Sequence, residues 1–294
     1  MPRRGWSGGP AESRGSRRGE GARPSRRRGI RLPRSLARPR LSPTRAAAIL
    51  GLLAASGALY GLAATPAFTL SRTELPDLRW TTRDALIAAI GTPPGTNLFR
   101  VRAAPIEARL DQLPGVASAH VLVSLPDTLV VRVEERRAIL AWAVGERRFL
   151  VDRDGVLFAS STPAAVTAAA LPAIGDSRTE APTLTVGSKL DPVDLDAATR
   201  LGSLVPADVG SRATSLVVQV TTANGFVVGT LPHSWIAIFG LYTPSLRTPA
   251  IVPGQVRLLR SLLAGREGTI DRVFLPDEDS GTLILKSAAP TVAP

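Results

Sequence analysis

The chain has no cysteine, only two histidines and few aromatic side chains. Without cysteine there is no disulfide framework and no thiolate chemistry. The two histidines leave few imidazole groups for metal binding or catalysis. The 294 residues must therefore fold around their own apolar cores, and the length is enough for one or two domains beside a membrane segment.

Sequence motifs of the common catalytic centres are also missing. The chain has no Gly-x-Ser-x-Gly turn, no Gly-rich phosphate loop ending in Lys, and no His-Glu-x-x-His motif. His120 is predicted within a strand and His233 in a proline-flanked turn, and we expect both to be surface or hydrogen-bonded residues. We therefore expect no catalytic residue, no metal and no cofactor, and a binding function rather than an enzymatic one.

Charge is distributed very unevenly along the chain. Residues 1–45 hold 14 Arg and two acidic residues, which accounts for the whole net charge of +12. This tail is rich in Arg, Gly, Pro and Ser, so we expect it to be disordered. Its arginines fit a topology signal that contacts anionic lipid, or nucleic-acid binding. Because Trp6 is the tail's only aromatic residue for base stacking, we favour the topology signal and expect no nucleic-acid partner.

An uncharged stretch follows the basic tail directly. Residues 46–71 carry no charge, and residues 46–64 are Ala, Leu, Ile and Gly with one Ser and one Tyr. As a helix, the second segment would be about 28 Å long, close to the ~30 Å hydrocarbon core of a bilayer. We predict a single membrane-spanning helix over residues 46–66. Positive charge on one side only indicates a cytoplasmic N-terminus and an extracytoplasmic body.

This stretch has a second interpretation and one further feature. A cleaved signal peptide is the alternative to a permanent span, because small residues near position 64 would suit a cleavage site. Against it, the apolar part and the region before it are longer than those of an ordinary signal peptide.

Gly57 and Gly61 form a GxxxG pair, which is a candidate helix–helix contact and also arises by chance in an Ala/Gly-rich helix.

Residues 67–136 predict a small domain with the order strand, helix, helix, strand, strand. The first strand is expected over residues 68–75, and the last two over residues 116–125 and 128–135. Apolar residues at helical spacing, with Gly and Pro at the ends, indicate the two helices. Apolar and charged side chains alternate in the last strand, which indicates one covered and one solvent-exposed face.

Three segments have a recognisable amino-acid sequence. Residues 113–119 read Leu-Pro-Gly-Val-Ala-Ser-Ala, residues 125–136 read Leu-Pro-Asp-Thr-Leu-Val-Val-Arg-Val-Glu-Glu-Arg, and residues 149–158 read Phe-Leu-Val-Asp-Arg-Asp-Gly-Val-Leu-Phe. These segments resemble the POTRA domain, and the segment after it, of the FtsQ/DivIB family of bacterial cell-division proteins. The layout of basic tail, span, POTRA domain and β-rich domain is also similar. The chain departs from the family at Ala138, where a proline is usual, and at residues 75–77, which affects the limits of the first strand.

The fold class is therefore predicted to be α+β, with a single transmembrane helix, a β-α-α-β-β POTRA domain, and a β-rich second domain with short helices over residues 137–286. Asp152-Arg153-Asp154-Gly155 indicates a hairpin turn, since a calcium loop would need further carboxylates at fixed spacing. Asn224-Gly225 indicates another hairpin. The remaining predictions are a connecting segment at residues 160–182, helices at 194–204 and 255–264, strands at 215–220, 226–230, 235–239, 269–275 and 282–286, and a disordered tail at 287–294.

The last predicted strand is the candidate binding site. Thr282, Leu283, Ile284 and Leu285 form a short apolar run after the acidic residues 277–279. A strand at the edge of a sheet offers unpaired backbone groups to which a partner segment can add a strand. A strand with a purely structural role is the alternative.

The resemblance implies a non-enzymatic scaffold of the bacterial divisome, held in the plasma membrane at the division septum, where it supports septal cell-wall synthesis. It also implies that the β domain recruits FtsB-like and FtsL-like bitopic proteins, partly through its last strands, and that the POTRA domain contacts other divisome members. A POTRA component of an outer-membrane assembly or secretion machine is the second hypothesis, which requires several POTRA repeats or a long array of alternating strands. A secreted or anchored enzyme is the third, and it requires a polar cluster that the sequence lacks.

Overall fold

The computed structural model describes residues 42–287. The basic tail predicted over residues 1–45 lies almost wholly outside this range, and so does the tail predicted over residues 287–294. The helix at the start of the described range and the two globular domains are described separately below.

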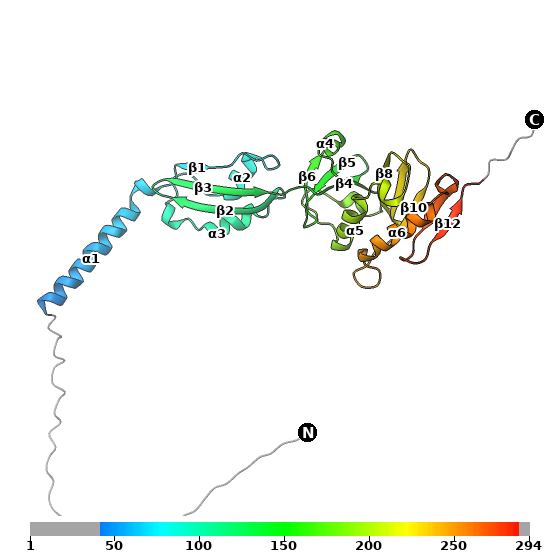
Figure 1. The fold of residues 1–294 in the computed structure, drawn as a ribbon. Coiled ribbons are helices and arrows are strands. Elements are labelled where there is room, and N and C mark those ends of the chain that lie inside the picture. Colours follow the sequence, from blue (N-terminus) through cyan, green and yellow to red (C-terminus); the bar gives the residue numbers. More distant parts are fainter. Residues whose placement is uncertain (1–41, 288–294) are drawn as a thin grey trace, which may run out of the picture. The chain divides into compact units, whose positions relative to one another are not determined.

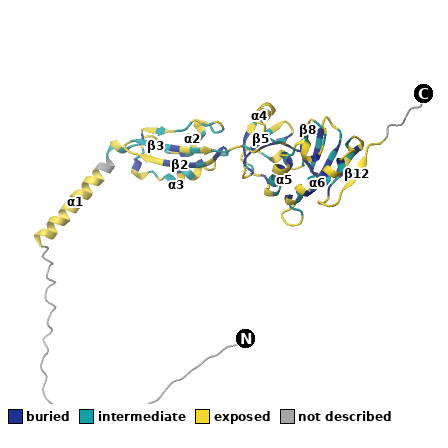
Figure 2. Cartoon of the chain, in the orientation of Figure 1, coloured by how far each residue is buried: buried dark blue, intermediate teal, exposed yellow. Residues whose placement is uncertain are grey.

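Helix α1 (Pro43–Ala64) is formed by the uncharged stretch. Its 22 residues give a length of about 33 Å, enough to cross the hydrocarbon core of a bilayer. Large apolar side chains along it, such as Leu53 and Tyr60, are exposed (Figure 2). Within residues 42–287, this is the one helix long and apolar enough to cross a membrane.

The first globular domain contains a three-stranded sheet. Its strands, β1 (Arg72–Glu74), β2 (Val116–Ser124) and β3 (Thr128–Glu135), lie in the order β1-β3-β2. Strand β3 is parallel to β1 and antiparallel to β2. Helices α2 (Arg83–Ile90) and α3 (Ala103–Leu110) connect β1 to β2, which confirms the predicted order of elements (Figure 1).

Both helices pack with the sheet into one apolar core. Leu86 of α2, Leu110 of α3 and Leu129 of β3 are all buried in it. The Thr82 side chain caps α2 by accepting a hydrogen bond from a backbone N–H of the first turn. The helix ends at Gly91, whose φ of 58° lies in the left-handed region that glycine adopts without strain.

The second domain is built on a mixed nine-stranded sheet with the order β12-β11-β10-β9-β8-β7-β4-β5-β6. Three neighbouring pairs are parallel, β4 with β7, β7 with β8, and β10 with β11, and the others are antiparallel. The strands are β4 (Leu140–Val144), β5 (Arg147–Val151), β6 (Leu157–Ser161), β7 (Ala173–Asp176), β8 (Ser215–Thr221), β9 (Gly225–Leu231), β10 (Ile236–Gly240), β11 (Ile270–Phe274) and β12 (Thr282–Leu285).

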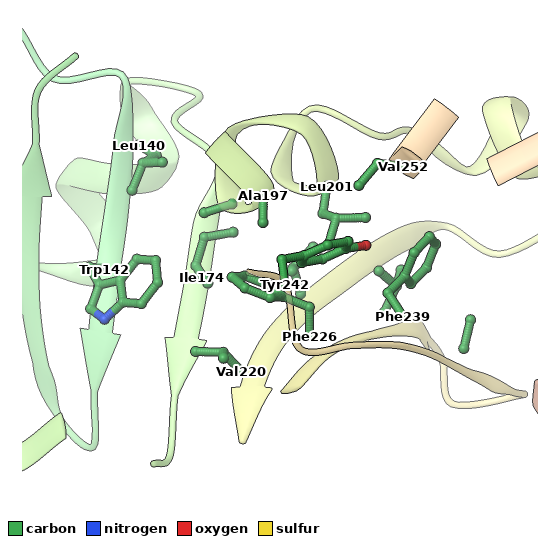
Figure 3. Close-up of a cluster of buried hydrophobic side chains, with 14 of the residues drawn as sticks. Leu140, Trp142, Ile174, Ala197, Leu201, Val220, Phe226, Phe239, Tyr242 and Val252 are labelled. Carbon is green, nitrogen blue, oxygen red and sulfur yellow. The ribbon is translucent and has the colours of Figure 1, made fainter. Parts of the chain in front are cut away.

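Two of the three parallel pairs are connected by a crossover helix. Helix α5 (Pro192–Gly202) lies between β7 and β8 in the chain, and α6 (Val252–Leu263) lies between β10 and β11. Their apolar faces cover the large side chains of the sheet, among them Trp142, Phe226 and Phe239, which are fully buried (Figure 3). This main core, together with a smaller cluster that includes Leu150, Phe158 and Val166, holds the second domain together without disulfides.

A charged cluster lies beside that core. Arg178 donates hydrogen bonds to Asp176 at 2.9 Å and to Asp194 at 2.6 Å, and Nε1 of Trp142 donates to Asp176 at 3.0 Å. Burial raises the pKa of Asp194 against the opposing effect of Arg178. Burial lowers the pKa of Arg178, but the hydrogen bonds to both carboxylates give a net raised pKa. The cluster links β4, β7 and α5, and its charges are paired as buried charges must be.

Both predicted hairpin turns are present. Asp152 accepts hydrogen bonds from the backbone N–H groups of Asp154, at 3.0 Å, and Val156, at 2.8 Å, and it also pairs with Arg136. This geometry is that of a turn between β5 and β6. Gly225 adopts a φ of 62° between β8 and β9, as the Asn-Gly signal predicts.

Three predicted elements differ in the structure. Residues 160–182 are not only a connecting segment, because they contain α4 (Pro163–Ala168) and β7. Strand β7 lies between β4 and β8, and its Ile174 is fully buried, which a four-residue strand among Ala, Thr and Pro residues does not reveal. The first strand is much shorter than residues 68–75. Phe68 ends the short helix η1 (Pro66–Phe68), Leu70 forms backbone hydrogen bonds with Gly95 and Thr96 in place of β3, and Pro76 limits pairing beyond Glu74. The apolar helix begins at Pro43, before the predicted position 46, because Ser42 accepts hydrogen bonds from its first turn.

Candidate partner-binding site

Strand β12 is the outermost strand of the nine-stranded sheet (Figure 1). It pairs antiparallel with β11, from Phe274 opposite Thr282 to Ile270 opposite Leu285. In the described part of the chain, no other strand pairs with it. The aliphatic run of the sequence therefore forms an edge strand, whose outer side is open to a further strand.

The side chains of β12 divide between the core and the solvent. Leu283 is half-buried and packs against the main core. Ile284 is 43% exposed and Leu285 is 60% exposed, which is a large fraction for aliphatic side chains. The edge thus offers both backbone hydrogen-bonding groups and apolar surface to a partner.

The acidic loop before β12 is ordered by its own carboxylates. Asp277 accepts hydrogen bonds from the backbone N–H groups of Asp279, at 2.9 Å, and Ser280, at 2.5 Å, and these bonds lower the pKa of Asp277. Glu278 lies against α6, since a Cβ on Gly254 would be 2.4 Å from the Cβ of Glu278. Together these contacts fix where β12 begins.

A recess adjoins the other end of β12. Lys286, directly after the strand, donates to the backbone oxygen of Gly268, which lines an open recess of about 410 Å³. Glu267 in this recess accepts hydrogen bonds from Ser211, from the backbone N–H of Arg212 and from Nε1 of Trp235. Partial burial raises the pKa of Glu267, but these bonds outweigh it and leave the pKa lowered.

Sequence reasoning did not find this recess. Ser211, Trp235 and Glu267 are distant in the chain and belong to no motif, so the fold alone brings them together. An exposed Arg212 beside the Glu267 carboxylate makes the recess a polar continuation of the apolar β12 edge.

The other predicted contact site is the glycine pair of α1. A Cβ built on Gly57 or on Gly61 meets no other atom within 4 Å, so this side of the helix is free to approach another helix closely. The pair remains a prediction from its spacing.

Metal ligands do not gather in the described residues. Across residues 42–287, no three His, Cys, Asp or Glu side chains lie close enough to hold a metal ion. His120 and His233 are both exposed.

Comparison with known proteins defines first the class of the three-stranded domain. Residues 72–136 match the family model described as "POTRA domain, FtsQ-type", which agrees with the β-α-α-β-β order of the structure. The first domain is therefore a POTRA domain of the FtsQ type.

Three similar curated proteins all carry the name "Cell division protein FtsQ". The one from Mycobacteroides abscessus is 33% identical over 99 residues, which is 34% of this chain and 32% of that protein. The one from Syntrophotalea carbinolica is 35% identical over 95 residues, or 32% and 34% of the two chains. The one from Streptomyces venezuelae is 33% identical over 159 residues, or 53% and 55%. The aligned part thus spans about a third to about half of these relatives, and the matches confirm the predicted resemblance to the FtsQ/DivIB family.

Proposed function

We propose that this chain is a non-enzymatic, bitopic membrane protein of the bacterial division machinery. The FtsQ-type POTRA domain and the relatives named for cell division support this role. In this proposal α1 spans the plasma membrane with the N-terminus in the cytoplasm. The POTRA domain and the β domain then lie outside, at the septum, where the protein supports septal cell-wall synthesis through its partners.

The open edge of β12 carries the proposed mechanism. A partner segment pairs with β12 as a tenth strand, and its successive side chains, which point to opposite faces of the sheet, cover Ile284 and Leu285. Beyond Leu285, the segment continues toward the recess that holds Arg212 and Glu267. Small bitopic division proteins of the FtsB and FtsL kind are the proposed partners. Gly57 and Gly61 provide a second contact, with a partner helix in the membrane.

A proline in β12 tests this mechanism. Proline donates no backbone hydrogen bond and is poorly accepted in a paired strand, so Ile284→Pro should prevent strand addition. We expect the variant to lose co-purification of FtsB-like and FtsL-like proteins from a detergent extract, with thermal unfolding of the main core little changed. Undiminished co-purification would contradict the mechanism. Recovery of outer-membrane components instead would favour a secretion or assembly machine.

The opposite edge of the sheet supplies the matched control. Ser160→Pro places the same residue in β6, the strand at the other end of the sheet order. If general destabilisation explained the loss of partners, both prolines would cause it. We expect Ser160→Pro to keep the partners bound.

A further inference from the structure

A second surface lies between helices α5 and α6 of the β domain. The end of α5, the short helix η4 (Pro206–Val209) and α6 surround an open groove of about 470 Å³. Three arginines and one aspartate stand among its lining residues, and aliphatic side chains form its floor. The residues that matter here are Arg200, Leu204, Asp208, Val256, Arg257 and Arg260.

Helix α6 separates this groove from β12. With 3.6 residues per turn, its side chains point in three directions. The first direction is the core, with the buried residues Val252, Gln255, Leu259 and Leu263. The second direction is the loop before β12. Gly254 faces Glu278 of this loop, and Leu258 and Leu262 face Gly281. The third is the groove, with Pro253, Val256, Arg257 and Arg260. The groove and the β12 edge therefore lie on opposite flanks of one helix, and each is accessible without the other.

The groove carries unpaired positive charge. Within residues 42–287, neither Arg257 nor Arg260 forms an ion pair or a side-chain hydrogen bond, and both are exposed. Arg200 on the facing rim pairs with Asp196 at 2.8 Å, but that pair is exposed and screened by solvent. The one acidic lining residue, Asp208, accepts a hydrogen bond from the backbone N–H of Val205 at 2.9 Å and belongs to the local turn.

The floor between the arginines is apolar. Leu204 and Val256 are half-buried and pack against the main core, so their outer surfaces remain accessible. Val205, next to Leu204, is 53% exposed. An apolar floor with basic residues on both rims is complementary to a helix that has an apolar stripe flanked by acidic side chains. The space between two helices also matches the way a third helix packs, by placing its ridges in their grooves.

We propose that this groove binds an acidic amphipathic helix of a partner protein. Arg257 and Arg260, one turn apart on α6, hold the carboxylates on one side of the incoming helix, and Arg200 holds those on the other. Leu204 and Val256 receive its apolar stripe. This goes beyond strand pairing at β12 and does not depend on it.

A pair of synthetic peptides tests the proposal on the full chain in detergent micelles. One peptide is an amphipathic helix of about 20 residues with a Leu stripe flanked by Glu, and the other has Lys in place of every Glu. Fluorescence anisotropy should show binding of the Glu peptide, weakened by added salt, and no binding of the Lys peptide. Equal binding of the two peptides would overturn the proposal.

Charge reversal locates the site. Arg257→Glu together with Arg260→Glu should weaken binding of the Glu peptide by about tenfold or more, because attraction becomes repulsion at two positions. The matched control is Arg153→Glu, at an exposed arginine of the β5–β6 turn, which should leave binding unchanged. Ile284→Pro should also leave it unchanged, which separates this surface from the one proposed for strand pairing. Unchanged binding in the double variant would refute the assignment.

Cross-linking in cells identifies the natural occupant. A photo-reactive amino acid at position 257 should capture a peptide of another protein with acidic residues at helical spacing around an apolar stripe, and one at position 153 should not. Capture of this chain's own acidic residues 277–279 would show a second copy in the groove and overturn the proposal. A captured peptide without acidic residues would do the same.

Discussion

Glu135, the last residue of β3, ties the POTRA sheet to the turn before α2. Its carboxylate accepts hydrogen bonds from three successive backbone N–H groups, those of Arg79 at 2.8 Å, Trp80 at 2.6 Å and Thr81 at 3.2 Å. Three donors converging on one carboxylate bridge parts of the chain more than 50 residues apart in sequence. In the alternation of β3, Glu135 has the parity of the apolar residues 129, 131 and 133, so the pattern does not reveal what it binds.

We expect Glu135→Gln to lower the free energy of unfolding by about 1–3 kcal/mol, because an amide NH₂ replaces one acceptor and faces the backbone donors. Urea unfolding of the full chain in detergent measures this loss. The neighbouring Glu134→Gln is the control, since Glu134 is exposed, and its effect should stay within about 0.5 kcal/mol. Equal losses in the two variants would contradict the role of the three hydrogen bonds.

Glu267 predicts a pH dependence of stability. Its pKa in the folded protein lies below the ordinary value of 4.5, so the unfolded chain binds more protons between the two values and stability rises with pH there. Above pH 4.5, we expect the free energy of unfolding of the wild type to exceed that of Glu267→Gln by about 1–2 kcal/mol, allowing for solvent screening. The difference should shrink as the pH falls through the folded pKa.

Unfolding titrations at a series of pH values measure that difference. Glu146→Gln, at an exposed carboxylate, is the control and should change the free energy of unfolding by no more than about 0.5 kcal/mol. If the difference in free energy of unfolding between wild type and Glu267→Gln grew as the pH fell, the prediction would be contradicted.

At the scale of elements, the position of β12 depends on α6. Gly254 of α6 leaves space that Glu278 fills, and a Cβ there would be 2.4 Å from the Cβ of Glu278. Both atoms are Cβ atoms, whose positions are fixed by the backbone, so no side-chain rotation can separate them. Relieving the clash therefore requires the loop that leads into β12 to move. The position of the β12 edge thus depends on a glycine of α6.

We expect Gly254→Ala to accelerate amide hydrogen exchange in β12, even though alanine favours helix by about 1 kcal/mol over glycine. Hydrogen exchange followed by mass spectrometry measures this. Gly268→Ala is the matched control, because a Cβ at Gly268 meets no atom within 4 Å. Unchanged exchange in Gly254→Ala would show that the loop adjusts without disturbing the strand.

At the scale of the whole molecule, the charge asymmetry predicts orientation. All of the net charge of +12 lies in residues 1–45, before the uncharged stretch, which should keep the N-terminus in the cytoplasm. Alkaline phosphatase, which is active only outside the cytoplasm, should be active when fused after residue 287 and inactive when fused before residue 42. An immunoblot of the membrane fraction should show the full-length chain. A chain shortened by cleavage near position 64 would support the signal-peptide alternative.

The sequence by itself determined the elements that depend on local patterns. The uncharged run predicts α1, the alternation predicts β3, and Asn224-Gly225 predicts the β8–β9 hairpin, because each depends on a period or a turn residue within a few positions. The amino-acid sequence of residues 113–136 was enough to indicate the FtsQ-type POTRA domain.

Only the tertiary structure decided what depends on distant partners. Strand β7 is too short to show a period, and it is a strand because β4 and β8 pair with it on both sides. Likewise, the apolar run at residues 282–285 forms an edge strand only because the sheet order leaves β12 outermost. The recess around Glu267 and the basic groove of α5 and α6 are made by residues far apart in sequence, and no local pattern encodes such a meeting.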